Sequence, residues 1–597
     1  MAIQKYQVNQ YLIESVMNWV VSNEIAIPEI QRPFVWKTSK VRDLIDSLYQ
    51  GFPVGYLISW RNPDVRLKDG SLSHGKKILI DGQQRVTALT AALLGQEVVN
   101  DDYKKVRIKI AFHPIKEIFE VSNPAISKSA DWFDDISPIL KGDISILKLV
   151  KSYCAANPTI DEELLASRVD RLKQILKMQI GFIDLEPHLD IEVVTEIFIR
   201  INSQGVVLSQ SDFAMSKLAA DSLTGSDLRK CIDYFCHLSI APEYYSHISE
   251  NDEEFLKTEY FQKIKWLKDE KDDLYDPDYK DVIRVAFTSE FSRGPLSDLV
   301  SLISGRNFAT RTYEQAIAEE TLARLKKAVL NFVSETNFKR FIMILKSAGF
   351  TDSGLITSTN TINFAYILYL KLREKGVADN LIESYVRKWL VLSLLTGRYI
   401  SSPESKFDED AKRIDSEDFA SILSGVESGQ LSAAFWEVEL VQELDKTNVS
   451  NPYINVFFAS QIRANDLGLL SSDITVRDLI GHRGDIHHIF PKAYLKQANS
   501  SRKFYNQIAN FAYTQSEINI KVGKKSPKQY FGEIIASIEA GKPIISGINS
   551  VEKLMVNLRM NCIPEEVISM EIERYADFTL ARRRLMAEKI KAYYFSL

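Results

Sequence analysis

The chain has few of the features that mark secreted or membrane-inserted proteins. Its 597 residues include only four cysteines and no CxxC pair, which suits a reducing cytoplasm. Cys231 and Cys236 lie about one helical turn apart and predict two half-buried thiols. No run approaches the roughly 18 apolar residues that span a bilayer, and the segment MAIQKYQVNQYLIESV has no apolar signal core. We therefore expect a cytoplasmic, soluble protein without a membrane partner.

The sequence also lacks an overall positive charge. The net charge is −5 and the isoelectric point is near 6.0, so any site for a polyanion has to be a local patch. The pattern GxxxxGK[ST] does not occur, which excludes a P-loop ATPase. Because 597 residues are too many for one core, we expect about three domains.

Hydrophobic periodicity suggests how the chain is organised. TSKVRDLIDSLYQG predicts a helix with Thr38 as its N-cap, KKILI (76–80) predicts a strand, and QQRVTALTAALLG predicts a helix closed by Gly95. From about residue 215 to 450 the patterns are mostly helical. The polar segment SSPESKFDEDAKRIDSED (401–418) predicts an exposed loop. The last part mixes strand and helix signals around a group of histidines and ends in the basic helix FTLARRRLMAEKIKAYYF.

Three of the eight histidines fall within seven residues, in GHRGDIHHIFPKAYL. We interpret His482 as an ordinary structural residue. His487 and His488 follow the strand-like pair Asp485-Ile486 and precede Ile-Phe-Pro. Hydrolysis of a phosphodiester near neutral pH needs a base to activate water and positive charge to stabilise the phosphate. A histidine and one divalent ion supply both.

The surroundings of the histidines are basic. Between residues 481 and 530 there are nine basic residues and two acids, a local charge of nine minus two, or +7. This contrasts with the acidic chain as a whole and matches what a phosphate backbone attracts. The basic residues are Arg483, Lys492, Lys496, Arg502, Lys503, Lys521, Lys524, Lys525 and Lys528.

The segment HHIFP, followed by Asn510 and, nine residues later, Asn519, resembles the HNH (His-Me finger) nucleases. That resemblance implies a ββα-metal fold and a divalent ion, Mg²⁺ or another such as Mn²⁺. It implies that His488 is the general base and that Asn510 holds the loop of the base. It also implies that His487 and Asn519 bind the ion. An acid is commoner at the position of His487, so Asp485 is a further candidate ligand.

The segment ILIDGQQRVTAL places an Asp-Gly turn between a strand and a helix. The opening amides of that helix, with Arg85 in the first turn, predict an anion site. Two other segments carry polar residues that suit such a site. IPEIQRPFVW contains Arg32, and EIFIRINSQGVVLSQSDF contains Arg200, Asn202 and a capping box from Ser209 to Asp212.

Taken in this order, these segments resemble the ParB/sulfiredoxin-like domain of the GmrSD and BrxU restriction enzymes, and the likeness continues through LLTGRYISSPESKFDED. The resemblance implies that a nucleoside triphosphate (ATP, GTP or CTP, which are not distinguished) binds and is hydrolysed around DGQQR. The residues it assigns to nucleotide binding are Arg32, Asp81, Gly82, Gln83, Gln84, Arg85, Arg200 and Asn202.

These observations predict an α+β multidomain protein. We expect a ParB/sulfiredoxin-like α/β domain over 1–240, a helical domain over 241–450, and an HNH nuclease domain with flanking helices over 451–597. The expected function is a nucleotide-regulated endonuclease of antiphage defence that cuts double-stranded DNA carrying modified bases or a modified backbone. The alternatives are a phosphorothioate-sensing NTPase that nicks DNA and a DNA-binding regulator that does not cut. The sequence leaves open whether the protein is a homodimer.

Overall fold

The structure is a computed structural model of the chain. It describes residues 5–22, 24–26, 36–60, 77–99, 105–186, 189, 193–194, 197, 210–220, 225–312, 314–446, 451–482, 484–497 and 501–597. The chain forms two compact units, residues 1–229 with 246–254, and residues 230–245 with 255–597. The division into three domains stays a prediction. In the described part, no helix is long and apolar enough to cross a membrane.

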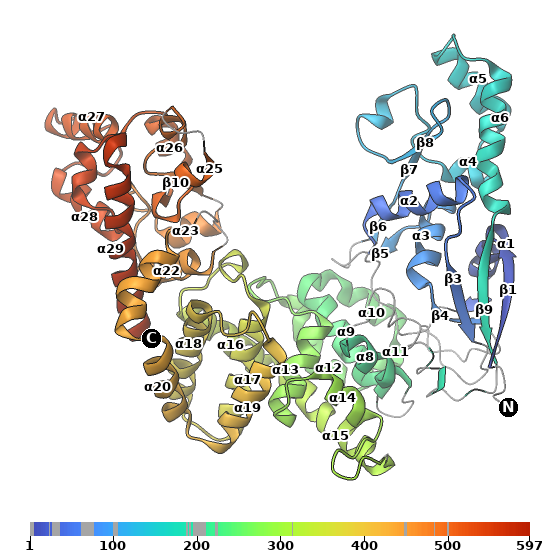
Figure 1. The fold of residues 1–597 in the computed structure, drawn as a ribbon, viewed down its shortest axis with the longest axis horizontal. Coiled ribbons are helices and arrows are strands. Elements are labelled where there is room, and N and C mark those ends of the chain that lie inside the picture. The colour runs from blue at the N-terminus through green and yellow to red at the C-terminus, as the bar shows by residue number, and fades with distance from the viewer. Residues whose placement is uncertain are drawn as a thin grey trace. The chain divides into compact units, whose positions relative to one another are not determined.

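A five-stranded mixed sheet forms the centre of the first unit (Figure 1). The strand order is β1-β9-β3-β4-β2, in which β1 and β9, and β3 and β4, are antiparallel while the other two pairs are parallel. Strand β4 corresponds to the strand predicted at 76–80. The bounds are β1 Tyr6–Leu12, β2 Ile25–Ala26, β3 Tyr56–Trp60, β4 Lys77–Asp81 and β9 Gln179–Leu185.

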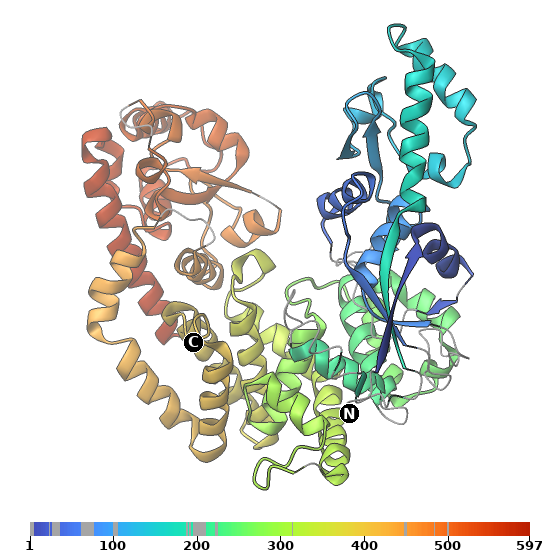
Figure 2. The ribbon, with the colours of Figure 1, turned by 45° about the vertical axis from the view of Figure 1, so that its right-hand side comes forward.

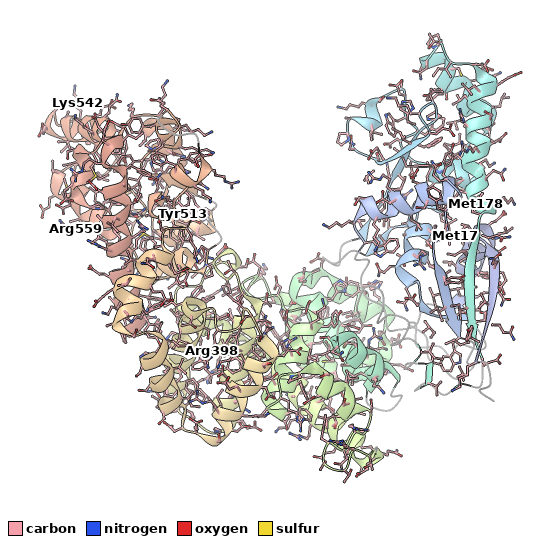
Figure 3. All side chains as sticks on the ribbon, in the orientation of Figure 1. Met17, Met178, Arg398, Tyr513, Lys542 and Arg559 are labelled. Carbon is pink, nitrogen blue, oxygen red and sulfur yellow. The ribbon has the colours of Figure 1, made fainter. Side chains whose placement is uncertain are left out.

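Three helices share one hydrophobic core with the sheet: α1 (Ile13–Val21), α2 (Thr38–Tyr49) and α3 (Gln83–Leu93). Helix α2 buries the apolar face that its sequence predicts. Its N-cap is Lys37, so the prediction of Thr38 as the cap is wrong by one residue. The predicted end of α3 is confirmed, since Gly95 follows with a φ of 69°. Figure 3 shows Met17 of α1 beside Met178; Met17 belongs to this core, and the partly buried Met178 packs against it.

A buried lysine links two strands of this sheet. Lys77 Nζ on β4 lies 3.3 Å from the carboxylate of Asp184 on β9. Asp184 also accepts hydrogen bonds from Ser59 and Asn9. Burial raises the pKa of Asp184, but these hydrogen bonds and the charge of Lys77 outweigh that effect, so its pKa lies below the usual value.

Smaller elements complete the first unit. Helix α6 leads through a short 3₁₀ turn into β9 (Figure 2). Two hairpins pair β5 with β6 and β7 with β8. The bounds are β5 Val98–Val99, β6 Lys105–Val106, β7 Ile110–His113, β8 Ile118–Val121, α4 Ser137–Lys141, α5 Ile146–Ala156, α6 Glu162–Lys173 and α8 Gln210–Ala220.

Helix α9 (Gly225–Ile240) carries the chain from the first unit into the second. It holds Cys231 and Cys236, which are both fully buried, so the prediction of half-buried thiols is wrong. Periodicity places them on an apolar face but does not reveal what covers that face. Burial raises the pKa of the Cys231 thiol, which makes it a structural rather than a reactive group.

The second unit begins with packed helices, and no strand lies among its described residues before β10, in agreement with the helical pattern of the sequence. Helices α17 (Thr359–Glu374) and α18 (Asp379–Thr396) form its centre. The other bounds are α12 Glu259–Ile264, α13 Tyr279–Phe291, α14 Leu296–Ile303, α15 Gln315–Phe332, α16 Glu335–Ser347, α20 Phe419–Gln430 and α21 Leu440–Glu443. Residues 246–254 belong to the first unit and contain most of α10 (Tyr245–Asn251) and the start of α11 (Glu253–Leu256).

The segment predicted as an exposed loop is instead a helix, α19 (Pro403–Ser416). Phe407, Asp410, Ala411 and Ile414 are buried and follow the i, i+3, i+4, i+7 spacing of a helix face. The loop prediction is wrong because one member of that face is an aspartate. In a mostly polar segment, the remaining apolar residues do not show the helical period clearly.

Asp410 is buried because it forms an ion pair with Arg398, which follows α18 (Figure 3). Arg398 Nε and Nη2 donate to the two carboxylate oxygens at 2.7 and 2.5 Å. Tyr399 Oη donates to the same carboxylate at 2.8 Å. The side chains of Arg398 and Asp410 are 2% and 1% exposed, so this pair fixes α19 against the rest of the helical part.

The C-terminal part of the second unit contains two short strands among helices (Figure 1). Ile489 and Phe490, which follow β10, share one hydrophobic core with Phe578 of the last helix. The bounds are α22 Pro452–Arg463, α23 Val476–Gly481, β10 Asp485–His488, α24 Lys492–Leu495, α25 Arg502–Tyr505, β11 Phe511–Thr514, α26 Ser516–Val522, α27 Pro527–Glu539, α28 Val551–Met560 and α29 Tyr575–Phe595.

Candidate functional sites

The DGQQR segment joins β4 to α3 in the first unit. Asp81 ends β4, and Gly82 caps α3 in the left-handed conformation with a φ of 90°. A Cβ atom at Gly82 would lie 2.3 Å from Leu57 Cδ2, so only glycine lets this turn approach β3. No side chain caps α3. Gln83 Nε2 donates back to the Leu79 carbonyl at 3.1 Å, and Gln84 lies beside it in the first turn.

The guanidinium of Arg85 lies against the backbone of two glycines. Its Nη1 donates to the Tyr56 carbonyl at 2.7 Å. A Cβ atom built on Gly55 or Gly82 would lie 3.1 or 3.4 Å from the guanidinium nitrogens. Burial lowers the pKa of Arg85, and the charge of Asp81 offsets part of that effect. Arg85 forms no ion pair within the described residues, so its positive charge is available to an anion at the N-terminus of α3.

Three other residues assigned to nucleotide binding, Arg32, Arg200 and Asn202, lie outside the described residues, as does Ser209 of the expected capping box. Within the described residues, the candidate anion site therefore consists of one turn, one helix start and Arg85. The contribution of Arg32, Arg200 and Asn202 stays a prediction.

In the second unit, the histidine segment forms one strand of a two-stranded antiparallel sheet. His487 of β10 pairs with Ala512 of β11, and His488 pairs with Phe511. Helix α26 begins two residues after β11 ends and carries Asn519. The order strand, strand, helix agrees with the predicted placement of both histidines on a strand and of Asn519 on a helix.

His487 and Asn519 are in direct contact. His487 Nδ1 lies 2.6 Å from Asn519 Oδ1, and His487 is 3% exposed. Neighbouring ligands of an octahedral ion with bonds of about 2.1 Å are about 3 Å apart. In the structure this contact is a hydrogen bond, in which Nδ1–H donates to the amide oxygen. An ion held by both atoms would replace this bond, with loss of the Nδ1 proton and a small increase in the separation of the two atoms. The side chain of Asp485, the third candidate, lies outside the described part of the chain.

Among the described residues, no three His, Cys, Asp or Glu side chains come together in a way that could hold a metal ion. The candidate set consists of one imidazole nitrogen and one amide oxygen. An imidazole favours transition ions over Mg²⁺.

His488 is the half-buried histidine of the pair. Its Nε2 lies 3.2 Å from Asn506 Oδ1, and its ring packs edge-on against Phe511 at 4.9 Å. With Asn506 Oδ1 accepting, Nε2 carries the proton and Nδ1 keeps the lone pair. Burial lowers the pKa of His488, as does the charge of Lys492, and together they outweigh the hydrogen bond that Nε2–H donates to Asn506, which raises the pKa. The ring is therefore neutral near pH 7 and can accept a proton.

Asn510 fixes the backbone that follows His488. It is fully buried, and its Oδ1 accepts from the Phe490 amide at 2.8 Å while its Nδ2 donates to the Phe490 carbonyl at 3.0 Å and the Tyr505 carbonyl at 3.3 Å. The Ile489 amide donates to the Asn510 carbonyl at 2.9 Å. Asn510 thus contacts backbone groups on both sides of the loop between β10 and β11. It acts on His488 through the backbone, not by touching the ring.

Three residues that the sequence analysis missed complete this arrangement. Asn506 contacts His488, and Tyr530 of α27 donates to the Ile489 carbonyl at 3.0 Å. Arg582 of α29 is fully buried and donates to the carbonyls of Ala509 and Phe511 at 2.8 and 2.7 Å, on either side of Asn510. Burial lowers the pKa of Arg582 to about 10. The only signal for it in the sequence is the arginine run of the last helix, which suggests a solvated face.

Residues 14–219 match the family described as "GmrSD restriction endonuclease, N-terminal domain". This match covers strands β2, β3, β4 and β9 of the first unit and the Asp81–Arg85 turn, and it supports a restriction endonuclease of the GmrSD type, a class that acts on DNA. The chain is also 21% identical over 596 residues to the uncharacterized protein MJ0686 of Methanocaldococcus jannaschii, with 94% of this chain and 92% of that protein covered. The likeness therefore extends through both units.

Proposed function

We propose that the protein is a nucleotide-regulated, modification-dependent DNA endonuclease of antiphage defence whose cutting centre is of the HNH type. The observation that carries this proposal is the meeting of His487 and Asn519 beside a neutral His488, on a strand–strand–helix unit whose loop is held by a buried asparagine. The restriction-endonuclease match of residues 14–219 supports the same class from the other end of the chain.

In this proposal His488 is the general base. Its Nδ1 accepts a proton from the attacking water, while Nε2–H donates to Asn506 Oδ1 and keeps the ring in one tautomer. His487 and Asn519 hold a divalent ion, with Asp485 as a further candidate ligand. When bound, that ion supplies positive charge for the phosphate and for the leaving oxygen. Asn510 keeps the backbone after His488 in place.

The first unit provides nucleotide regulation in this proposal. The triphosphate binds at the start of α3, where Gly82 brings the backbone amides close and Arg85 supplies a charge without an ion pair in the described chain. DNA cleavage then requires both hydrolysis of that nucleotide and recognition of the modified DNA. Arg32, Arg200 and Asn202 are proposed to complete this pocket.

A cleavage assay tests the proposal. Purified protein is given plain, cytosine-modified and phosphorothioate DNA, each with and without ATP, GTP and CTP. We expect a cut that needs a nucleotide and a modified substrate and that EDTA abolishes. His488→Ala should reduce cleavage by about 10² to 10⁴, the usual contribution of a positioned base, while DNA binding and nucleotide hydrolysis persist.

Other outcomes would redirect the assignment. Cleavage confined to phosphorothioate DNA as single-strand nicks would identify the phosphorothioate-sensing NTPase instead. DNA binding without any cleavage, under every nucleotide and ion, would identify a regulator. A folded His488→Ala protein that cuts at the parent rate would refute the role of the base. Cleavage restored after EDTA by Mn²⁺ or Ni²⁺ more fully than by Mg²⁺ would support an imidazole ligand.

A further inference from the structure

A groove of about 630 Å³ opens at the C-terminal end of α26, the helix that carries Asn519. The residues that matter for its chemistry come from the end of α26, the turn after it and the start of α27. We call it the basic groove and define it by Gln497, Ile520, Lys521, Lys524, Lys525 and Gln529.

The positive charge of the basic groove is only partly compensated. Lys525 forms an ion pair with Glu533. Lys521 Nζ donates to the Ile544 carbonyl at 3.1 Å. In the described residues, neither Lys521 nor Lys524 forms an ion pair. Glu571 also lines the groove, and its carboxylate lies 3.5 Å from Lys528 Nζ. Lys521, Lys524 and Lys525 outnumber this acid on the same concave surface, which favours a polyanion.

The position of the groove relative to Asn519 determines which part of a bound DNA strand the groove can contact. Val522, which lines the groove, lies three residues after Asn519 on α26. At 1.5 Å per helical residue this corresponds to about 5 Å along the axis. One nucleotide of a DNA strand advances about 3.4 Å, so a strand with its scissile phosphate at Asn519 passes the groove within about one to three nucleotides.

Ile520 adds an apolar surface between the proposed metal ligand and the lysines. It is 79% exposed, the highest value among the large hydrophobic side chains described. A free inorganic phosphate has no apolar part to place there. A polynucleotide does, since its sugars alternate with its phosphates.

We infer that the basic groove binds the phosphates of the cut strand about one to three nucleotides from the scissile bond, with Lys521 and Lys524 on the phosphates and Ile520 against a sugar. This inference rests on the proposed nuclease function and names the part of the DNA that the second unit holds. The groove thereby sets the register of the strand at His488.

Salt-dependent DNA binding tests the inference. Full-length protein carrying His488→Ala, which keeps the DNA intact, is titrated into labelled 30-base-pair DNA between 50 and 200 mM NaCl. Each lost phosphate contact reduces the slope of log K against log salt by about 0.9. We expect Lys524→Ala to reduce the slope by about one contact, and Lys521→Ala with Lys524→Ala to reduce it by about two.

Lys553→Ala is the matched control because Lys553 is an exposed lysine on α28 of the same unit and does not line the groove. Its slope should equal that of the parent. Because Lys521 also bonds to the backbone, Lys524→Glu provides a second variant that leaves this contact alone. It should weaken binding at 100 mM NaCl by about tenfold or more.

Two results would overturn the inference. One is an unchanged salt slope in Lys524→Ala, in Lys524→Glu and in the double variant. If His488→Ala alone still abolished DNA cleavage, the nuclease proposal would then stand without the groove. The other is loss of ATP binding in Lys524→Glu with DNA binding intact, which would make the groove a nucleotide pocket. A reduced slope in a protein that never cuts DNA would retain the groove and refute the nuclease.

Discussion

Asn510→Ala is the change that most directly tests how the segment after His488 is held. The substitution removes three hydrogen bonds and leaves the Phe490 amide and the carbonyls of Phe490 and Tyr505 without these partners. A buried polar group left unsatisfied costs about 1–3 kcal/mol. Because a carbonyl keeps a second lone pair that neighbouring groups can use, we expect a total of about 3–6 kcal/mol.

This loss should appear locally as faster exchange of the Phe490 amide. At about 1.4 kcal/mol per factor of ten, the expected acceleration is about 10² to 10⁴, measured by hydrogen–deuterium exchange of the peptide from 486 to 495. DNA cleavage should fall as well, because the backbone that carries His488 is no longer fixed. Far-UV circular dichroism checks that the helices remain.

Asn380→Ala is a suitable control because Asn380 is exposed on α18 of the same unit. Exposed substitutions of this kind usually change stability by less than about 0.5 kcal/mol, so exchange at Phe490 should not change. If Asn510→Ala also left exchange and cleavage at the parent values, the asparagine would not be what holds this loop.

Three further predictions concern other parts of the chain. Asp410→Ala should lower the thermal midpoint strongly, because an uncompensated Arg398 left in the interior costs about 3–5 kcal/mol; replacing both residues by leucine should recover much of the loss in calorimetry. Arg85→Ala should abolish triphosphate binding in a filter assay while the Phe490 amide exchanges at the parent rate. Unchanged affinity for the triphosphate would mean that DGQQR is an ordinary turn. Since the pKa of Asp184 is lowered in the folded state, its stabilisation is complete above its unfolded pKa of about 3.9 and is lost as the pH falls further. Urea unfolding between pH 3 and 7 should show that acid loss in the parent and a smaller one in Asp184→Asn.

The sequence predicts best where one local pattern decides the structure. The face of α2 and the strand at β4 follow from period 3.6 and from a short β-rich run, and both come from residues adjacent in the chain. Helix α19 could not be predicted in the same way, because its buried face includes Asp410. The carboxylate is stable there only through Arg398, and no spacing in the sequence indicates that pairing.

The same distinction between local and long-range contacts applies to the candidate centre. His487, His488, Asn510 and Asn519 stand in a recognisable order, and the structure brings His487 to Asn519. Arg582 could not be found from that order, because it lies 71 residues beyond Phe511, whose carbonyl it holds. A contact of this kind depends on how α29 packs, and packing is set by the whole core.

Arg582 also affects when the centre can form during protein synthesis. A chain is made from its N-terminus, and its early domains fold first. The carbonyls of Ala509 and Phe511 gain their buried donor only from residue 582 of 597. A ribosome-bound chain can therefore assemble the first unit while the strand with both histidines still lacks its support, so a protein that cuts DNA would become competent only at the end of its own translation. Premature termination before α29 would release a fragment that has the histidine motif but lacks the arginine that supports its loop.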